Sequence, residues 1–159
     1  MKSRFLFSHN LKGIGWALFG LGVVFGMIAW ITEYDFDENF QIKVFALVDE
    51  GFMSSESYFK VIENGIVDEL ICVLILVGGI LVGFSKAKEE DEFISRIRSE
   101  SLIWATYVNY AVLLFSVVFV YGITFFNILI YNMFTSLIFF ILRFHYVLYK
   151  SKKNLSYEE

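Results

Sequence analysis

The residue types that usually carry out chemistry are few in this sequence and lie far apart. The two histidines, His9 and His145, lie near opposite ends of the chain, and neither belongs to an H-E-x-x-H zinc pattern. The single cysteine, Cys72, lies deep in an apolar run, where a thiol is weakly reactive. No serine lies in a G-x-S-x-G context, and no glycine-rich phosphate loop is present. The sequence therefore predicts no enzymatic activity, no catalytic residue and no cofactor.

A short acidic run is the one candidate for a metal site. The segment from Asp35 to Asn39 reads D-F-D-E-N, which matches the start of a calcium-binding EF-hand loop. The sixth position of that loop is Phe40, where glycine is needed, and the twelfth is Ala46, where a bidentate glutamate is needed. We therefore expect no metal ion here.

The segment 86–100 carries the clearest charge pattern. Its sequence, KAKEEDEFISRIRSE, lacks glycine and proline, and a run of four acids precedes the two arginines, which complements a helix dipole. We expect a cytoplasmic helix that lies against the inner membrane interface or projects from the apolar run that follows. One hypothesis makes it the docking surface for a cytoplasmic protein partner, and the alternative makes it a solvated helical linker. The candidate partner-binding residues are Asp91, Glu92, Phe93, Ile94, Arg96, Ile97 and Arg98.

The same segment carries a resemblance to a known group of proteins. From Asp91 to Ala105 the chain reads D-E-F-I-x-x-I-R-x-x-S-L-x-x-A. This resembles a D-E-x-x-x-x-I-R-x-x-S block that precedes the third span in small, uncharacterised four-span bacterial inner-membrane families. Some of these families are found beside small helix-turn-helix regulators. The resemblance implies a bacterial inner-membrane protein, is compatible with a regulatory partner, and assigns no activity.

Polar side chains inside the apolar runs are further candidates, because polar groups are costly in lipid and are often functional there. Asn109 and Tyr110 lie in the inner half of the third run. Asn132, Ser136 and Arg143 fall near one face of the fourth. We expect these five residues to form an intramembrane polar seam that lines a pathway or binds a small headgroup. The alternative is interhelical hydrogen bonding, worth under about 1 kcal/mol per contact.

Glycines at a spacing of four mark two helix faces. Gly22-x-x-x-Gly26 lies in the first apolar run, with Gly15 seven residues earlier on the same face, and Gly79-x-x-x-Gly83 lies in the second. Such small-residue faces let helix backbones approach closely in a membrane. We expect the two faces to pack on each other within one chain; the alternative is a homodimer interface.

The elements that must position these residues are membrane spans. The 159 residues are 57% hydrophobic and only 19% charged, with a mean hydropathy of +0.62, all typical of a membrane protein. Apolar runs long enough to cross a bilayer predict an all-α membrane protein, a single domain whose four transmembrane helices form a four-helix bundle. A glycine at the Tyr121–Ile123 midpoint of the last long run is expected to supply the turn of a short hairpin. The expected spans are 13–32, 68–85, 101–121 and 124–146.

The loop 33–67 between the first two spans is expected to be extracytoplasmic and partly folded. Ten acidic and only two basic residues lie between Glu33 and Glu69, together with many apolar side chains. Alternation predicts a short strand over Phe40–Val44, and Ser57–Glu69 is more typical of a helix that feeds into the second span. The loop is interpreted as a small folded lid or as an acidic cap that recognises a cation or a partner.

The distribution of basic residues predicts the topology. Eleven of the thirteen lysines and arginines lie toward the two ends of the chain or between the second and third spans, whereas only Lys43 and Lys60 lie in the extracytoplasmic loop. By the positive-inside rule, both termini face the cytoplasm of a bacterial inner membrane. The net charge of −4 argues against direct nucleic-acid binding, which leaves the lipid bilayer and a protein as expected partners.

These patterns favour an accessory or regulatory membrane protein that binds a partner through residues 86–101. The alternative is a small oligomeric channel, transporter or membrane-perturbing effector that uses the polar seam. A third class, a structural protein that assembles a larger membrane complex, cannot be separated from the first by sequence. The oligomeric state is left open.

Overall fold

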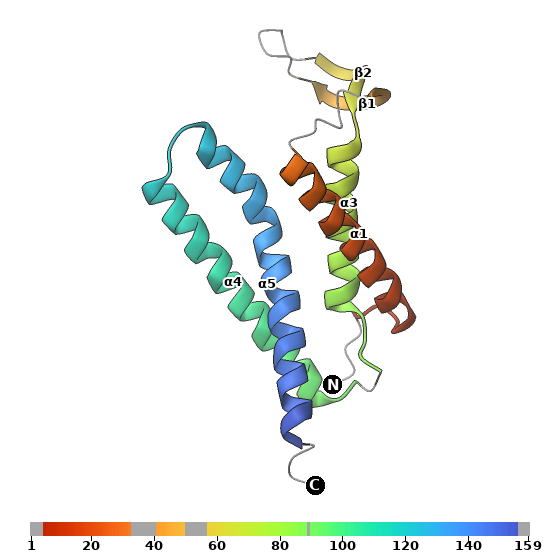
Figure 1. The fold of residues 1–159 in the computed structure, drawn as a ribbon, viewed down its shortest axis with the longest axis vertical. Helices are drawn as coiled ribbons and strands as arrows, with labels where there is room; N and C mark the ends of the chain where they lie inside the picture. Colours follow the sequence, from red (N-terminus) through yellow and green to blue (C-terminus); the bar gives the residue numbers. More distant parts are fainter. Residues whose placement is uncertain (1–4, 33–40, 50–56, 89, 156–159) are drawn as a thin grey trace.

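A computed structural model of the chain describes residues 5–32, 41–49, 57–88 and 90–155. Four helices are long and apolar enough to cross a membrane, which agrees with the four predicted spans and with a multi-pass membrane protein. A two-stranded sheet lies between the first two helices in sequence (Figure 1). The elements are α1 (Asn10–Thr32), β1 (Gln41–Asp49), β2 (Ser57–Gly65), α3 (Val67–Phe84), α4 (Glu92–Phe119) and α5 (Ile123–Leu155).

The helix ends follow from local sequence. Asp91 caps the start of α4, because its Oδ1 accepts a hydrogen bond of 2.7 Å from the N–H of Ile94. Gly122, with φ of +74°, provides the tight turn between α4 and α5, as the sequence predicts. The separate helix expected over 86–100 is corrected: its described residues before Glu92 are not helical, and the rest form the first turns of α4. This is the expected alternative in which the segment projects from the third span.

The helices form two antiparallel pairs rather than one evenly packed bundle. α1 packs along α3 and α4 along α5, and contacts between α3 and α5 join the pairs. In Figure 1 the pairs converge where α1 begins and α5 ends, and they diverge toward the sheet. We call the converging region the closed end. Its core consists of Val82, Ile94, Ile97, Ala105, Phe140, Ile141 and Phe144.

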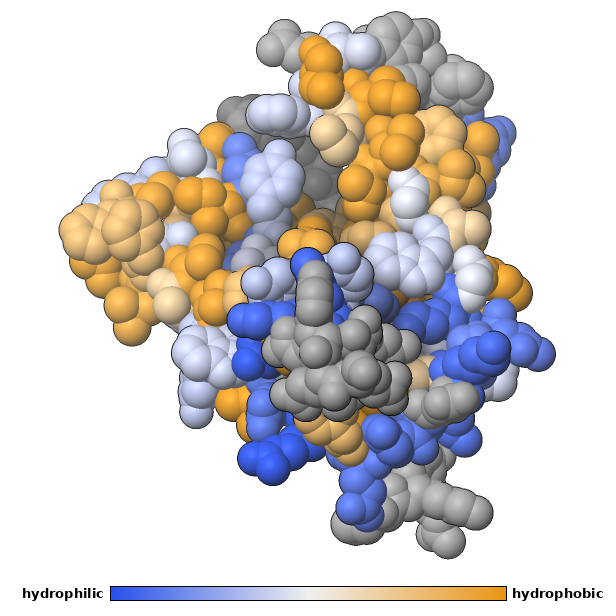
Figure 2. Space-filling view, turned by 60° about the horizontal axis from the view of Figure 1, so that its bottom comes forward, coloured by the Kyte–Doolittle hydropathy of each residue, from blue (hydrophilic) through white to orange (hydrophobic). Residues whose placement is uncertain are grey.

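The surface of the helices is apolar, whereas the closed end is polar. Many large apolar side chains on all four helices are exposed, including Phe25, Val73, Leu114 and Ile130. Such a surface requires lipid rather than water around it. Figure 2, in which the closed end comes forward, shows hydrophilic residues gathered at that end and hydrophobic residues over the helices beyond it. The arrangement is that of a bilayer-spanning body with a polar end outside the hydrocarbon.

The glycines of α1 pack this helix on α3 within one chain, as the sequence predicts. A Cβ added to Gly15 would lie 2.7 Å from the Leu81 Cβ, and one added to Gly22 would lie 2.8 Å from the Ile75 Cγ1. At Gly26 the nearest atom would be at an ordinary contact distance of 3.4 Å. Only residues without a side chain therefore allow the approach at the first two positions.

The glycine pair of α3 faces a different helix from the one expected. A Cβ on Gly79 would lie 2.5 Å from a Leu137 side-chain carbon, and one on Gly83 would lie 2.5 Å from the Phe140 ring, both on α5. The α3 glycine that meets α1 is instead Gly78, whose added Cβ would overlap the backbone of Phe19. α3 thus carries two small-residue faces, which explains how it contacts both α1 and α5.

The segment between the first two spans contains a hairpin rather than a strand and a helix. β1 extends the expected strand to Asp49, whereas Phe40 lies outside the described residues. The helix expected over Ser57–Glu69 is wrong as far as Gly65, because β2 pairs antiparallel with β1 and α3 begins only at Val67. Cross-strand pairs such as Val44 with Ile62 place β-branched side chains opposite each other, which favours strands. The chain is thus consistent with the predicted all-α protein of four helices, to which the structure adds one two-stranded sheet between α1 and α3.

Candidate functional site

Arg98 lies at the centre of a buried polar cluster at the closed end. Its Nη1 donates to Glu90 Oε1, and its Nη2 donates to Glu90 Oε2 at 3.1 Å, so the pair is bidentate. The Nη2 atom also approaches the backbone oxygen of Ser85 at 3.4 Å. Arg98 is only 7% exposed and Ser85 is fully buried. The connection between α3 and α4 is thereby fastened to the second turn of α4.

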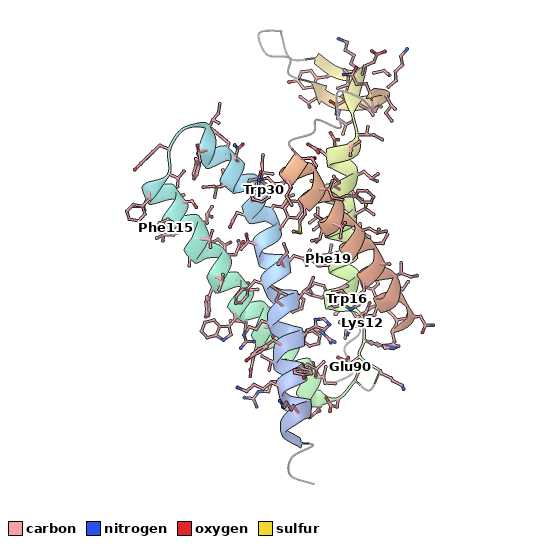
Figure 3. All side chains as sticks on the ribbon, viewed as in Figure 1. Lys12, Trp16, Phe19, Trp30, Glu90 and Phe115 are labelled. Atoms are coloured by element: carbon pink, nitrogen blue, oxygen red, sulfur yellow. The ribbon has the colours of Figure 1, made fainter. Side chains whose placement is uncertain are left out.

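An aromatic ring of α5 completes this cluster. The Arg98 Cζ lies 5.1 Å from the centroid of the Phe144 ring, and the Lys12 Nζ of α1 lies 5.9 Å from the same centroid. In Figure 3 the labelled side chains of Lys12, Trp16 and Glu90 all lie toward the closed end. Side chains from α1, α4, α5 and the α3–α4 connection therefore meet at one point.

The backbone preceding α1 is part of the same end. The N–H of Phe7 donates to Phe84 O at 2.9 Å, and the N–H of Lys86 donates to Phe7 O at 3.0 Å. The Nδ1 of His9 lies 3.1 Å from Lys86 O. These bonds form a short parallel bridge between Phe7 and Ser85. The residues that precede α1 are thus hydrogen-bonded to the C-terminal end of α3 and the residues just after it.

The charge state of Glu90 follows from its neighbours. Burial alone raises the pKa of its carboxyl group, but hydrogen bonds from Arg98 and from the N–H of Ala87, with the Arg98 charge, outweigh burial. The pKa of Glu90 is consequently lower than its usual value, and the group stays ionised at neutral pH. The Ala87 N–H donates to Glu90 Oε2 at 2.8 Å, which orients the carboxylate toward Arg98.

The inner part of the predicted polar seam is a contact between α4 and α5. The Nη1 of Arg143 donates to the hydroxyl oxygen of Ser101 at 2.9 Å, and the Arg143 Cζ lies 5.6 Å from the Trp104 ring centroid. Ser101 is fully buried. Arg143 therefore bridges the two helices.

Two asparagines lie deeper along the same helix pair. The amide oxygens of Asn109 and Asn132 are buried and have no hydrogen-bond partner in the described part of the chain. The Ser101–Arg143 contact sets the antiparallel register, so the two asparagines lie within about one helical turn of each other in depth. Ser136 is half-buried, whereas Tyr110 is exposed and does not belong to a buried seam.

The predicted docking segment divides into a buried face and an exposed face. Ile94 and Ile97 belong to the core together with Arg98, so they are not available to a partner, and Asp91 serves as the helix cap. Glu92, Phe93 and Arg96 are exposed. Arg96 pairs with Glu100, one turn later, at 3.0 Å. Sequence periodicity identified this helix but placed Arg98 on the wrong side, because its counter-ion Glu90 lies in a non-helical connection.

The remaining candidate groups for chemistry stay apart. His145 lies against Trp16, with ring centroids 5.2 Å apart, and its Nδ1 lies 2.9 Å from Ile141 O. Within residues 5–32, 41–49, 57–88 and 90–155, no three His, Cys, Asp or Glu side chains gather to hold a metal ion. The calcium-like run 35–40 lies outside the described residues. The absence of enzymatic activity stays a prediction.

Comparisons with protein-family models, curated proteins and solved structures found no match. They recognise no family, so the resemblance based on 91–105 also stays a prediction.

Proposed function

We propose that the chain is an accessory or regulatory protein of a bacterial inner membrane, with both termini in the cytoplasm, and that it docks a protein partner at the start of α4. The observation that carries this proposal is the half-exposed ring of Phe93, 51% accessible, on a helix start whose opposite face is fixed in the core. The basic residues clustered toward this end support a cytoplasmic location.

The exposed face has the composition of a recognition surface. Phe93, Arg96 and Glu100 lie at helical spacing on one side of α4, and we call them the docking face. Aromatic and arginine side chains supply most of the binding free energy at protein interfaces. The cap at Asp91 and the pairing of Arg98 with Glu90 fix the helix before a partner arrives, which reduces the entropy lost on binding.

A photo-crosslinking amino acid at Phe93 tests the proposal in native membranes. We expect one discrete protein adduct at this position that disappears when Arg96→Glu is added. Arg98 is left unchanged in this test because its reversal would disrupt the core. The matched control carries the same crosslinker at Leu114, an exposed α4 residue in the lipid-facing part, where only lipid adducts are expected. The proposal that the docking face binds a partner is contradicted if no protein adduct forms at Phe93, or if the adduct still forms when Arg96→Glu is added.

A second candidate function rests on the buried amide oxygens of Asn109 and Asn132. A buried carbonyl oxygen without a partner costs roughly 1–3 kcal/mol, which water or a polar solute between α4 and α5 would offset. This supports a small oligomeric channel, transporter or membrane-perturbing effector. The purified protein would then conduct in planar bilayers, and Asn132→Leu would reduce the conductance. A non-conducting monomer or dimer excludes the oligomeric channel.

A further inference from the structure

One face of the hairpin exposes a contiguous set of apolar side chains. Phe45 and Leu47 alternate along β1, so both point to the same side of the sheet, and Val61 of β2 is paired directly with Phe45. The ring of Phe59 lies on this side too, because its centroid is 6.3 Å from that of Phe45. These four residues, which we call the apolar face, are 63%, 62%, 71% and 59% exposed in the order Phe45, Leu47, Phe59, Val61.

Such a hairpin needs a cover. An isolated two-stranded sheet is marginally stable in water, and it becomes stable when an apolar face packs against something else. The opposite face is partly covered, since Val44, Ala46 and Ile62 are half-buried. On that opposite face Ile42, Val48 and Tyr58 are 47%, 55% and 59% exposed, whereas every side chain of the apolar face is at least 59% exposed. The apolar face is therefore the less covered of the two and is the one that requires a neighbour.

The position of the hairpin relative to the membrane follows from α3. β2 ends at Gly65 and α3 begins at Val67, so a single residue, Ile66, separates the strand from the span. Asn64 Nδ2 donates to Glu69 Oε1 at 2.9 Å, which ties the strand end to the first turn of the helix. Figure 1 shows the sheet lying across the tip of α3 rather than extending far beyond it.

The length of α3 holds the hairpin close to the bilayer. Its 18 residues rise about 27 Å, slightly less than the roughly 30 Å thickness of the hydrocarbon core. A helix of this length leaves its first turn at the boundary between hydrocarbon and headgroups. A sheet that starts one residue earlier must then lie within the headgroup layer, where aromatic and amphipathic elements are favoured.

We propose that the β1–β2 hairpin is an interfacial membrane element whose apolar face inserts into the outer headgroup layer of the lipid bilayer. A second copy of the chain is a poorer occupant for two reasons. Covering four side chains buries only a few hundred Å² per copy, well below the roughly 800 Å² per partner of a stable interface. The segment from Glu33 to Glu69 also carries ten acidic and two basic residues, so two copies would repel each other.

The proposal is tested with spin labels on the full-length protein in phosphatidylcholine vesicles. Cys72→Ala removes the only cysteine, and a single label is placed at Leu47 on the apolar face or at Val48 on the opposite face. Val48 is the matched control, since it is the next residue and is 55% exposed. We expect the ratio of collisions with lipid-soluble oxygen to collisions with a water-soluble nickel chelate to be several-fold higher at Leu47 than at Val48. A label at Val61 repeats the test from the other strand in case the Leu47 variant disturbs the hairpin.

Each other outcome overturns the proposal. Equal, water-like collision ratios at Leu47, Val61 and Val48 mean that lipid does not cover the apolar face. Dipolar broadening at Leu47 that disappears on dilution with unlabelled protein identifies a second copy as the cover. If the label has a water-like ratio in pure vesicles and is shielded from the nickel chelate only in native membranes, the cover is a protein partner instead. None of these results bears on the docking face of α4, which lies at the opposite end.

Discussion

Removing one member of the buried Arg98–Glu90 pair should destabilise the protein more than removing both. The two side chains are only 9% and 17% exposed, so Arg98→Met leaves a carboxylate with little access to water. Breaking a buried pair in this way costs about 3–5 kcal/mol, whereas replacing both partners with apolar residues of similar size is often neutral. Because Glu90 keeps some contact with solvent, we expect a loss near the lower value, about 3 kcal/mol.

The comparison is made as a double-mutant cycle. Arg98→Met, Glu90→Met and the double variant are unfolded in mixed micelles of a mild detergent with increasing dodecyl sulfate. We expect the double variant to lose about 1 kcal/mol or less; with about 3 kcal/mol lost in each single variant, the coupling free energy is about 5 kcal/mol. The matched control is Arg96→Met, whose partner Glu100 is largely solvated and whose loss should be below about 0.5 kcal/mol.

Two results would refute this account. If the losses from the single variants simply add in the double variant, the two charges do not stabilise each other. If Arg98→Met behaves like Arg96→Met, the cluster is hydrated in the membrane and Glu90 does not need its counter-ion.

Three further predictions concern the charge of Glu90, the helix contact of α1 and the topology. Because the pKa of Glu90 is lower in the folded than in the unfolded chain, its stabilisation is present above the unfolded pKa and is lost as the pH falls through the folded value. In the micelle assay, the free energy of unfolding of Glu90→Gln should therefore fall less at acid pH than that of the unmodified protein. An unchanged pH dependence would contradict the lowered pKa of Glu90. Gly22→Ala should destabilise the protein by about 1–3 kcal/mol in the same micelle assay, because the added carbon meets the backbone and side chains of α3. Gly20→Ala is its control, since nothing lies within 4 Å and alanine is the better helix former, and an equal loss at both positions would mean that the contact between α1 and α3 does not decide. In intact cells whose outer membrane is made permeable, a membrane-impermeant maleimide should label Lys60→Cys and not Ser99→Cys in the Cys72→Ala background. The reverse pattern would invert the predicted topology.

The number of spans could be predicted from sequence because it depends on local properties. A run of apolar residues bounded by charges must form a helix in lipid, where every backbone group needs an internal partner. The turn at Gly122 was predictable for the same reason, since a glycine in the middle of a double-length run is a local signal. The small-residue face of α1 was recognisable from its spacing alone.

The partners of those local features were decided only by tertiary structure. The spacing of Gly79 and Gly83 shows that α3 has a small-residue face. It does not show that this face meets α5, or that the neighbouring Gly78 meets α1. Sequence alone predicts a helix where β2 lies, because the pairing of β2 with β1 is non-local and the apolar residues of a short segment fit both helical and strand periodicity. Arg98 was expected on an exposed surface because helical periodicity cannot place Glu90 and Phe144 beside it. Sequence therefore determined which segments enter the bilayer, since lipid acts on each segment separately. Only the packing of four helices determined which side chains are buried at the closed end, because burial requires neighbours that are distant in sequence.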